Sequence, residues 1–286
     1  MGSAAPMRSA LFVPATRPER IAKALASGAD GVIVDLEDAV APGDKAHARD
    51  NLRRFLEQEP RARLCVRINA VGSDQHRPDV ALCAHPGVSA IVLPKAAAAA
   101  DIERIAATGK PVWPIIESAT GVVQLRALAR ARGVERLALG TLDLMHDLDW
   151  VAEAPPVERA LDQVRCELVL HSRAADLAPP LDGVHAALDD EAGLSRAAAR
   201  ARAFGFGGML CIHPRQVETV NAAFTPSQEE LVWARRVLEA AGSREAVAVL
   251  DGQMVDAPVI ARARRLLSRA KPDEMSASVS RRQKES

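Results

Sequence analysis

The stretch Gly31–Leu36 (GVIVDL) decides the fold of this 286-residue chain, because it is apolar at almost every position. A strand covered on one face alternates apolar and polar residues, whereas a strand buried on both faces forms a continuous apolar run. The run therefore predicts a strand of a parallel sheet that is covered on both faces. The following segment, Asp44–Glu59, is predicted to be a helix, so strand and helix alternate from the start.

Further short apolar runs recur along the chain, and Ala-, Arg-, Leu- and Glu-rich helical stretches separate most of them. These runs are Ala10–Pro14, Leu64–Asn69, Ala90–Pro94, Pro111–Ile116, Arg136–Gly140, Leu181–His185 and Met209–His213. About eight β/α units within about 220 residues match a (β/α)8 TIM barrel. A doubly wound open sheet is the main competitor, but no G-x-G-x-x-G follows the first strand. We therefore predict an α/β fold with a TIM barrel.

The chain continues beyond the eighth run with a second type of segment. A helix is predicted over Ser227–Ala241, then a short connector over Ala246–Asp256, then a helix over Ala257–Ala270. This part is too small for an independent core, so we expect it to pack on the barrel or on a neighbouring subunit. The expected parts are 8–224, a barrel catalytic domain; 225–270, a C-terminal helical extension; and 271–286, a polar tail expected to be disordered.

Composition argues against several classes of function. The formal net charge is +0 and the pI is about 7.1, so no global field favours nucleic acid or an acidic membrane. No apolar run approaches membrane length, and we expect no signal peptide. The scattered cysteines have no C-x-x-C spacing, and Cys65 and Cys211 lie in apolar runs. We expect them to be buried, reduced thiols of a cytoplasmic protein rather than zinc ligands or disulfides.

Two acidic residues follow apolar runs on consecutive strand–helix units: Glu117 after Pro111–Ile116, and Asp143 after Arg136–Gly140. A carboxylate at the end of a buried strand needs a cation or hydrogen-bond donors, because burying it unpaired is expensive. Two of them indicate a hard-metal site with oxygen ligands suited to Mg²⁺. A pair of helix N-caps, or a buried ion pair, is the alternative that the sequence leaves open.

Polar residues end nearly every predicted strand, and in a barrel they converge on one mouth. These residues are Asp35, Glu37, Asp38, Arg67, Asn69, Lys95, Glu117, Asp143, Asp182 and His213. Each of them alone has a structural explanation, such as a helix cap or a solvated charge. Their convergence favours a functional cleft.

The residue types indicate a chemistry. Carboxylates with a divalent cation can chelate a 2-oxo or 2-hydroxy acid, and the cation acts as a Lewis acid on the carbonyl oxygen. Arg67 can hold a substrate carboxylate with a fork of N–H donors. Stabilised oxygen charge beside a breaking C–C bond is what aldol or Claisen cleavage needs. A Schiff base on Lys95 ranks lower, because it leaves the acidic metal pair unexplained.

Several motifs in a fixed order resemble one known family. They include DLEDAV (35–40), VRIN (66–69), PIIES (114–118), GTLD (140–143), IHPRQ (212–216) and DGQMVDAP (251–258). Together they resemble the citrate lyase beta-subunit-like branch of the HpcH/HpaI aldolase superfamily, which includes citryl-CoA, malyl-CoA and citramalyl-CoA lyases. The resemblance runs in register from about residue 8 to residue 270.

The resemblance implies roles around the metal. Glu117 and Asp143 stand where the family binds Mg²⁺, and Arg67 stands where it binds the substrate carboxylate and takes part in catalysis. Glu37 and Asp38 match the acidic pair behind the metal site, which orients water or Arg67.

The resemblance also implies contacts with coenzyme A and with a neighbouring subunit. Arg17 and Lys23 match positions that contact CoA phosphates, and Ile212 and Pro214 match the rim that contacts pantetheine or the nucleotide. Asp256 matches an aspartate that enters the active site of a neighbouring subunit as an acid/base. A homotrimer or a dimer of trimers is therefore expected.

One motif departs from the family pattern at the expected substrate-binding residues Gly140, Thr141 and Leu142. Many relatives carry GAED where this chain has GTLD, so Leu142 stands in place of a glutamate. The ligand Asp143 is retained, but the lining of the pocket changes, which leaves the substrate open.

The sequence thus predicts a Mg²⁺-dependent carbon–carbon lyase that cleaves a short-chain 3-hydroxyacyl-CoA acid of the citryl-, malyl- or citramalyl-CoA type. The products would be an acyl-CoA and a 2-oxo acid. One alternative is a malate-synthase-type condensation with thioester hydrolysis. Another is a subunit of a citrate lyase complex that acts on a carrier-bound substrate. The DGQMVDAP segment favours a stand-alone enzyme, because it supplies its own acid/base.

Overall fold

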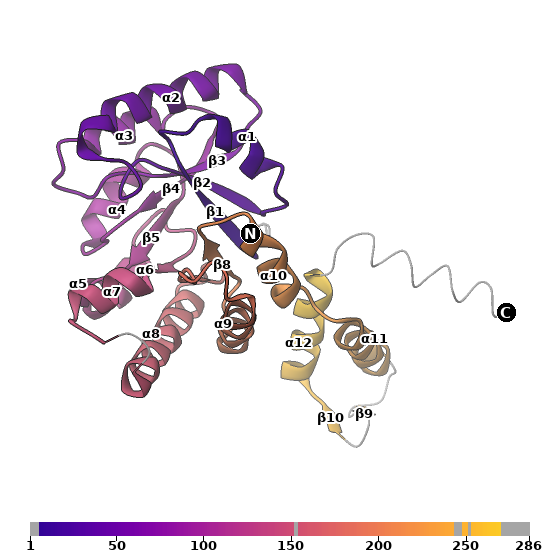
Figure 1. The fold of residues 1–286 in the computed structure, drawn as a ribbon. Helices are drawn as coiled ribbons and strands as arrows, with labels where there is room; N and C mark the ends of the chain where they lie inside the picture. The colour runs from indigo at the N-terminus through magenta and orange to yellow at the C-terminus, as the bar shows by residue number, and fades with distance from the viewer. Residues whose placement is uncertain (1–5, 152–153, 243–247, 251–252, 270–286) are drawn as a thin grey trace. The chain divides into compact units, whose positions relative to one another are not determined.

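The computed structural model describes residues 6–151, 154–242, 248–250 and 253–269 (Figure 1). The chain divides into two compact units, Met1–Phe224 and Thr225–Ser286. The predicted tail at 271–286 lies outside the described residues, as do Asp251 and Gly252 of the DGQMVDAP motif.

In the first unit, eight parallel strands close into a barrel in sequence order, and β1 pairs with both β2 and β8. The strands are β1 (Ser9–Pro14), β2 (Gly31–Asp35), β3 (Leu64–Arg67), β4 (Val88–Leu93), β5 (Val112–Ile116), β6 (Ala138–Leu139), β7 (Leu181–Asp182) and β8 (Gly208–Cys211). The predicted (β/α)8 TIM barrel is therefore confirmed.

Helices follow the strands and cover the outside of the barrel (Figure 1). They are α1 (Glu19–Leu25), the short 3-10 helix η1 (Pro42–Asp44), α2 (Lys45–Gln58), α3 (His76–Leu82), α4 (Ala99–Ala106), α5 (Ala119–Val123), α6 (Leu125–Arg130), α7 (Thr141–Asp147), α8 (Pro155–Ala174), α9 (Glu191–Phe204) and α10 (Arg215–Phe224).

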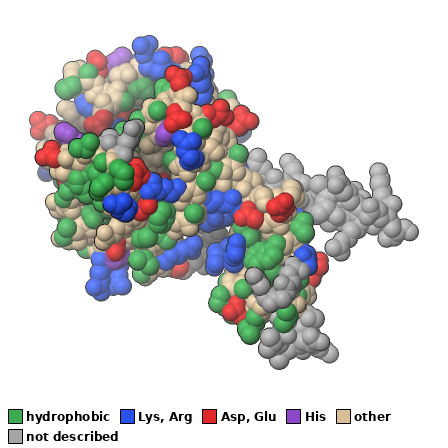
Figure 2. All heavy atoms as spheres, turned by 60° about the horizontal axis from the view of Figure 1, so that its bottom comes forward, with side chains coloured by type: hydrophobic (Ala, Val, Ile, Leu, Met, Phe, Trp, Pro, Cys, Tyr) green, Lys and Arg blue, Asp and Glu red, His purple; other side chains and the backbone are tan. Residues whose placement is uncertain are grey.

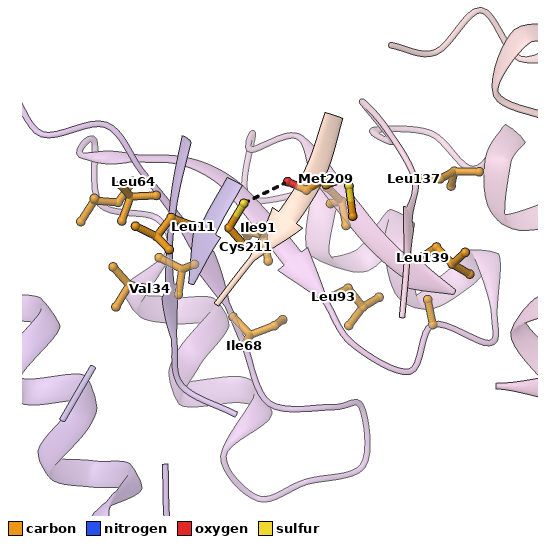
Figure 3. Packing of buried hydrophobic residues seen from close by; sticks show 14 of the residues in the cluster. Leu11, Val34, Leu64, Ile68, Ile91, Leu93, Leu137, Leu139, Met209 and Cys211 are labelled. Atoms are coloured by element: carbon orange, nitrogen blue, oxygen red, sulfur yellow. Dashed lines mark hydrogen bonds between the residues drawn. The ribbon is translucent and has the colours of Figure 1, made fainter. Parts of the chain in front are cut away.

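The core of the barrel has two layers, because successive strand residues point to opposite faces. Leu11, Val34 and Leu64 belong to the layer between the strands and the helices (Figure 3). The barrel interior is filled by a separate cluster of strand residues that includes Trp113. The expected burial of Cys65 and Cys211 is confirmed; they lie in the inner and the outer layer, respectively.

Several strands are shorter than the apolar runs that predicted them. The runs at Arg136–Gly140 and Leu181–His185 contain strands of only two residues each. Each strand ends before a glycine, Gly140 or Gly183, and a Cβ on Gly183 would lie 2.5 Å from the Thr141 hydroxyl oxygen. The chain is therefore closely packed directly after these two strands.

The second unit contains α11 (Gln228–Gly242), β9 (Ala248–Leu250), β10 (Gln253–Val255) and α12 (Ala257–Ser268). Its helices share a small apolar core that includes Ala234, Val237 and Ala263. The segment predicted as a connector contains instead an antiparallel hairpin of β9 and β10. The Asp-Gly dipeptide at 251–252 is a strong hairpin signal in the sequence.

The face drawn in Figure 2 carries charged side chains of both signs. Basic and acidic side chains are interspersed over the face that Figure 2 draws, in accord with the net charge of +0. Among the described helices, none is both long and apolar enough to cross a membrane.

Candidate active site at the barrel mouth

A cavity of about 280 Å³ lies at the carboxyl ends of the barrel strands. Its charged lining consists of Asp35, Asp38, Arg67, Glu117 and Asp143. These residues come from four different strand–helix units, which the parallel barrel brings to one end. The structure therefore brings together most of the charged residues that were predicted to converge.

The predicted substrate-binding stretch lines the same cavity. Gly140, Thr141 and Leu142 contribute to the wall, as does Ile212 from the loop after β8. The side chains of Leu142 and Ile212 are partly exposed, at 45% and 42%. The cavity thus combines a charged side with apolar positions at its rim.

Glu117 follows β5 and is only 4% exposed. Its Oε1 accepts a 2.6 Å hydrogen bond from the backbone N–H of Lys95. Burial raises the pKa of Glu117 to about 8 against the effect of that N–H, and the charges of Asp143 and Glu37 add to the rise. A Cβ on Gly140 would lie 2.5 Å from Oε2 of Glu117, so the glycine leaves this carboxylate its space.

Neither predicted metal ligand caps a helix. Ser118 caps α5 by accepting the N–H of Gly121. The N-cap position of α7 is Gly140, and Asp143 lies inside the first turn. The N-cap explanation for Glu117 and Asp143 is therefore wrong.

Glu117 and Asp143 fit a divalent cation with oxygen ligands. Burial raises the pKa of Glu117, and neighbouring carboxylates add to the rise, so its charged form gains from added positive charge. Mg²⁺ commonly uses one or two carboxylates and keeps several waters. Within the described part of the chain, no cluster of three or more His, Cys, Asp or Glu side chains could hold a metal. The donor set therefore suits Mg²⁺ better than a closed zinc cage.

Arg67 ends β3, and its guanidinium is held from several sides. Nε and Nη2 donate to the two carboxylate oxygens of Asp35 at 2.8 and 2.6 Å. Nη1 lies 3.2 Å from Oε2 of Glu37 and 3.4 Å from Oδ2 of Asp38. The guanidinium carbon lies 4.8 Å from the centroid of the Phe12 ring. Asp35 thus occupies two of the N–H donors that were expected to hold a substrate carboxylate, and Nη1 is the nitrogen that does not bond Asp35.

The acidic pair Glu37 and Asp38 shares a second cation, Lys95. The Lys95 ammonium donates to Oε1 of Glu37 at 2.6 Å and lies 3.6 Å from Oδ1 of Asp38. Burial raises the pKa of Glu37, although Arg67 and Lys95 act to lower it. Burial acts to lower the pKa of Lys95, but its bond to Glu37 and the nearby carboxylates raise that pKa overall. A protonated ammonium is a poor nucleophile, so this setting disfavours a Schiff base.

Asp35 was expected at the mouth, but no contact with Arg67 was predicted for it. It pairs in register with Arg67 across β2 and β3, and its side chain fixes the arginine. The signal that could have found this pair is an acid at the end of one strand and an arginine at the end of the next.

Three other polar residues that were predicted to converge have structural roles instead. Oδ2 of Asp182 accepts a 2.9 Å hydrogen bond from Nε of Arg165 on α8. Asn69 donates to the carboxylate of Asp79 at 2.6 Å. Nδ1 of His213 accepts the N–H of Arg215 at the start of α10. None of the three is among the residues that line the cavity.

The predicted contacts for coenzyme A lie on exposed parts of the barrel. Arg17 is in the turn after β1, and Lys23 is in the last turn of α1. Pro214 directly precedes α10 and is exposed.

Asp256 belongs to the second unit, where its Oδ1 accepts the N–H of Val259 at 3.1 Å as the N-cap of α12. The structure of one chain leaves the roles of these residues as predictions.

The whole arrangement matches a known family. The sequence pattern of the HpcH/HpaI aldolase/citrate lyase family matches residues 8–214. The chain belongs to this family. The expected resemblance is therefore confirmed, and it includes all eight barrel strands.

Individual relatives cover nearly the whole chain. A citrate lyase subunit beta-like protein of Mycobacterium tuberculosis is 38% identical over 268 residues, which is 91% of this chain and 94% of the relative. A (3S)-malyl-CoA thioesterase of Cereibacter sphaeroides is 35% identical over 273 residues, or 93% of this chain and 95% of the relative. A crystal structure of M. tuberculosis CitE with magnesium, acetoacetate and coenzyme A matches with a TM-score of 0.82 at 38% identity, covering 93% of this chain and 98% of that chain.

Proposed function

We propose that this protein is a Mg²⁺-dependent carbon–carbon lyase that cleaves a 3-hydroxyacyl-CoA acid of the citryl-, malyl- or citramalyl-CoA type. The observation that carries the proposal is one cavity lined by Glu117, Asp143 and Arg67. Its volume of about 280 Å³ suits a small acid better than a whole CoA thioester. The CitE structure with magnesium, acetoacetate and coenzyme A supports the same combination of ligands for this chain.

In this proposal Glu117 and Asp143 hold Mg²⁺. When bound, the ion supplies a Lewis acid for the oxygen of the 2-oxo acid. Nη1 of Arg67 binds the carboxylate of that acid, while Asp35 keeps the guanidinium in place. Buried Ile115 and Leu139 line the cavity and keep water away from the reacting carbon.

The remaining predicted residues complete the reaction. A base takes the hydroxyl proton, the C–C bond breaks, a carbonyl forms in the 2-oxo acid, and the electron pair stays with the acyl-CoA as an enolate. Asp256 of a neighbouring copy protonates this enolate, in a homotrimer or a dimer of trimers. Glu37 and Asp38 orient water or Arg67.

In this proposal, exposed residues on α1, before it, and at the rim of the mouth recognise the thioester. Arg17 and Lys23 attract the phosphates of coenzyme A, and Ile212 and Pro214 contact its pantetheine arm or nucleotide. The exposed positions of Arg17 and Lys23 support this assignment, because solvated cations can meet a large anionic ligand without rearrangement.

Thioester hydrolysis is the second candidate function, because the C. sphaeroides relative is a (3S)-malyl-CoA thioesterase. Two readouts separate the candidates. The wild type is incubated with Mg²⁺ and malyl-CoA, citramalyl-CoA or citryl-CoA, and free 2-oxo acid and free CoA thiol are measured in parallel.

A lyase releases a 2-oxo acid without a CoA thiol, whereas a thioesterase releases the thiol and an intact hydroxy acid. EDTA should stop lyase turnover. Thiol release alone would contradict the lyase proposal, and so would turnover that EDTA leaves unchanged.

A further inference from the structure

Lys95 and Arg67 share the same two carboxylates, Glu37 and Asp38. Nζ of Lys95 lies 2.6 Å from Oε1 of Glu37 and 3.6 Å from Oδ1 of Asp38. Nη1 of Arg67 lies 3.2 Å from the other oxygen of Glu37 and 3.4 Å from the other oxygen of Asp38. Each carboxylate therefore stands between an ammonium and a guanidinium.

Nη1 matters because the other half of the guanidinium is already used. Nε and Nη2 of Arg67 bind both oxygens of Asp35, whose side chain is 1% exposed. Nη1 has longer contacts and lies on the side of the acidic pair. It is the nitrogen best placed to exchange these contacts for a substrate carboxylate.

Glu37 is the strongest competitor for this nitrogen. Its side chain is 6% exposed, and its Oε2 accepts no hydrogen bond from the described residues. A buried carboxylate is drawn to nearby cations, because an unpaired buried charge is costly, and Oε2 of Glu37 already lies 3.2 Å from Nη1 of Arg67. Without the ammonium on Oε1, Glu37 would be drawn more strongly to Nη1 of Arg67.

The backbone of Lys95 is held in an unusual conformation by its surroundings. Its φ is +50°, in the left-handed region that non-glycine residues seldom adopt. The turn is fixed on both sides, since the N–H of Lys95 bonds Glu117 and the N–H of Ala96 bonds the carbonyl of Ile115. A Cβ on Gly121 would lie 2.9 Å from the Ala96 carbonyl oxygen, so α5 packs closely on the turn.

We propose that Lys95 is a positioning residue that holds Glu37 and Asp38 and so keeps Nη1 of Arg67 open to the carboxylate of the 2-oxo acid. This inference rests on the proposed function, because it assumes that Arg67 binds that carboxylate. The backbone N–H of Lys95 bonds the proposed metal ligand Glu117. The side chain of Lys95 holds Glu37, which lies beside Arg67.

The test is Lys95→Met, which removes the ammonium and keeps the chain length and the backbone N–H. Pyruvate binding is measured by calorimetry in saturating Mg²⁺, and Mg²⁺ binding is measured separately. Pyruvate should bind about tenfold more weakly or worse, the effect of losing one charged hydrogen bond. Mg²⁺ affinity should stay within about twofold, because the N–H to Glu117 remains.

A second change separates competition from general damage. In Lys95→Met with Glu37→Gln, the stronger of the two competing charges is removed, so pyruvate affinity should return to within about threefold of wild type. The control is Lys110→Met, because Nζ of Lys110 bonds the backbone carbonyls of His85 and Val88, far from the mouth. This control should leave pyruvate affinity unchanged.

Normal pyruvate affinity in Lys95→Met would overturn the inference and leave the proposed function standing. A loss that Glu37→Gln does not rescue would also overturn it, because the lysine would then act through packing alone. If the wild type with Mg²⁺ bound none of pyruvate, glyoxylate and oxaloacetate, both the proposed function and this inference would be wrong.

Discussion

Asp35 and Arg67 face each other across β2 and β3, and two hydrogen bonds of 2.8 and 2.6 Å join them. Only a guanidinium can place two N–H donors on one carboxylate in this way. The pair sets the direction of the remaining nitrogen, Nη1, in the mouth of the barrel.

Arg67→Lys should therefore keep the charge and lose the geometry. We expect 2-oxo acid binding to weaken by about 1.5–3 kcal/mol, the scale of a charged hydrogen bond. Calorimetry with pyruvate and oxaloacetate in saturating Mg²⁺ measures the change. Unchanged affinity for both acids would remove Arg67 from the substrate site.

Glu117→Gln and Asp143→Asn should each abolish tight Mg²⁺ binding and most turnover, because each removes a charged oxygen ligand. The matched control is Asp50→Asn on α2, whose side chain is 58% exposed. Calorimetry with MgCl₂ and the lyase assay measure both effects. The metal assignment is wrong if either site variant keeps near-wild-type activity in EDTA.

The metal-free protein should lose stability as pH rises, because of Glu117. Its folded pKa is about 8 against a usual 4.5, so the folded state holds the proton more tightly than the unfolded state. The stability from this group is complete below about pH 4.5 and declines until about pH 8.

In EDTA, Glu117→Gln should remove that decline. At pH 8.5 its free energy of unfolding should exceed that of the wild type by at least about 2 kcal/mol. At pH 4.5 the two proteins should be similar. Thermal melts across this range test the sign. A wild type that gains stability relative to the variant with rising pH would contradict the expected effect.

Arg17→Ala combined with Lys23→Ala should raise the KM for the CoA thioester, and more at low salt than at high salt, since exposed charges are screened. Arg20→Ala, at an exposed arginine on α1 between the two positions, is the control. Binding of a free 2-oxo acid should stay normal. Equal loss of thioester and free acid would mean that Arg17 and Lys23 are structural.

Asp256 should act on a neighbouring copy rather than only cap α12. Asp256→Ala and Glu117→Gln should each be inactive alone, and a mixture under subunit exchange should regain activity. Mixed oligomers contain sites with both groups intact. Full activity of Asp256→Ala, or a monomer at assay concentration, would show that the carboxylate serves only the helix.

The barrel was predictable because its strands are buried on both faces. Apolar runs such as Gly31–Leu36 have no polar alternation, and eight of them with helices between leave few folds to consider. The hairpin in the second unit was missed despite the Asp-Gly turn signal at 251–252, because its strands are only three residues each. Runs that short show too little periodicity to be recognised.

The sequence predicted which residues lie at the site better than it predicted the contacts that they make. Strand ends in a barrel meet at one mouth, so Glu117, Asp143 and Arg67 could be grouped from their positions alone. The sequence could not tell which polar residues turn to the cavity and which, like Asp182, turn to a neighbouring helix. Side-chain direction at the end of a two-residue strand depends on packing, which no local pattern encodes.

The most direct test of the account is the stoichiometry of products from malyl-CoA and citramalyl-CoA with wild-type protein and Mg²⁺, followed by mass spectrometry. The account predicts one acyl-CoA and one 2-oxo acid for each thioester consumed, with no turnover in EDTA. Free coenzyme A with an intact hydroxy acid as the only products, or no turnover of any CoA thioester of the citryl-, malyl- or citramalyl-CoA type, would contradict it.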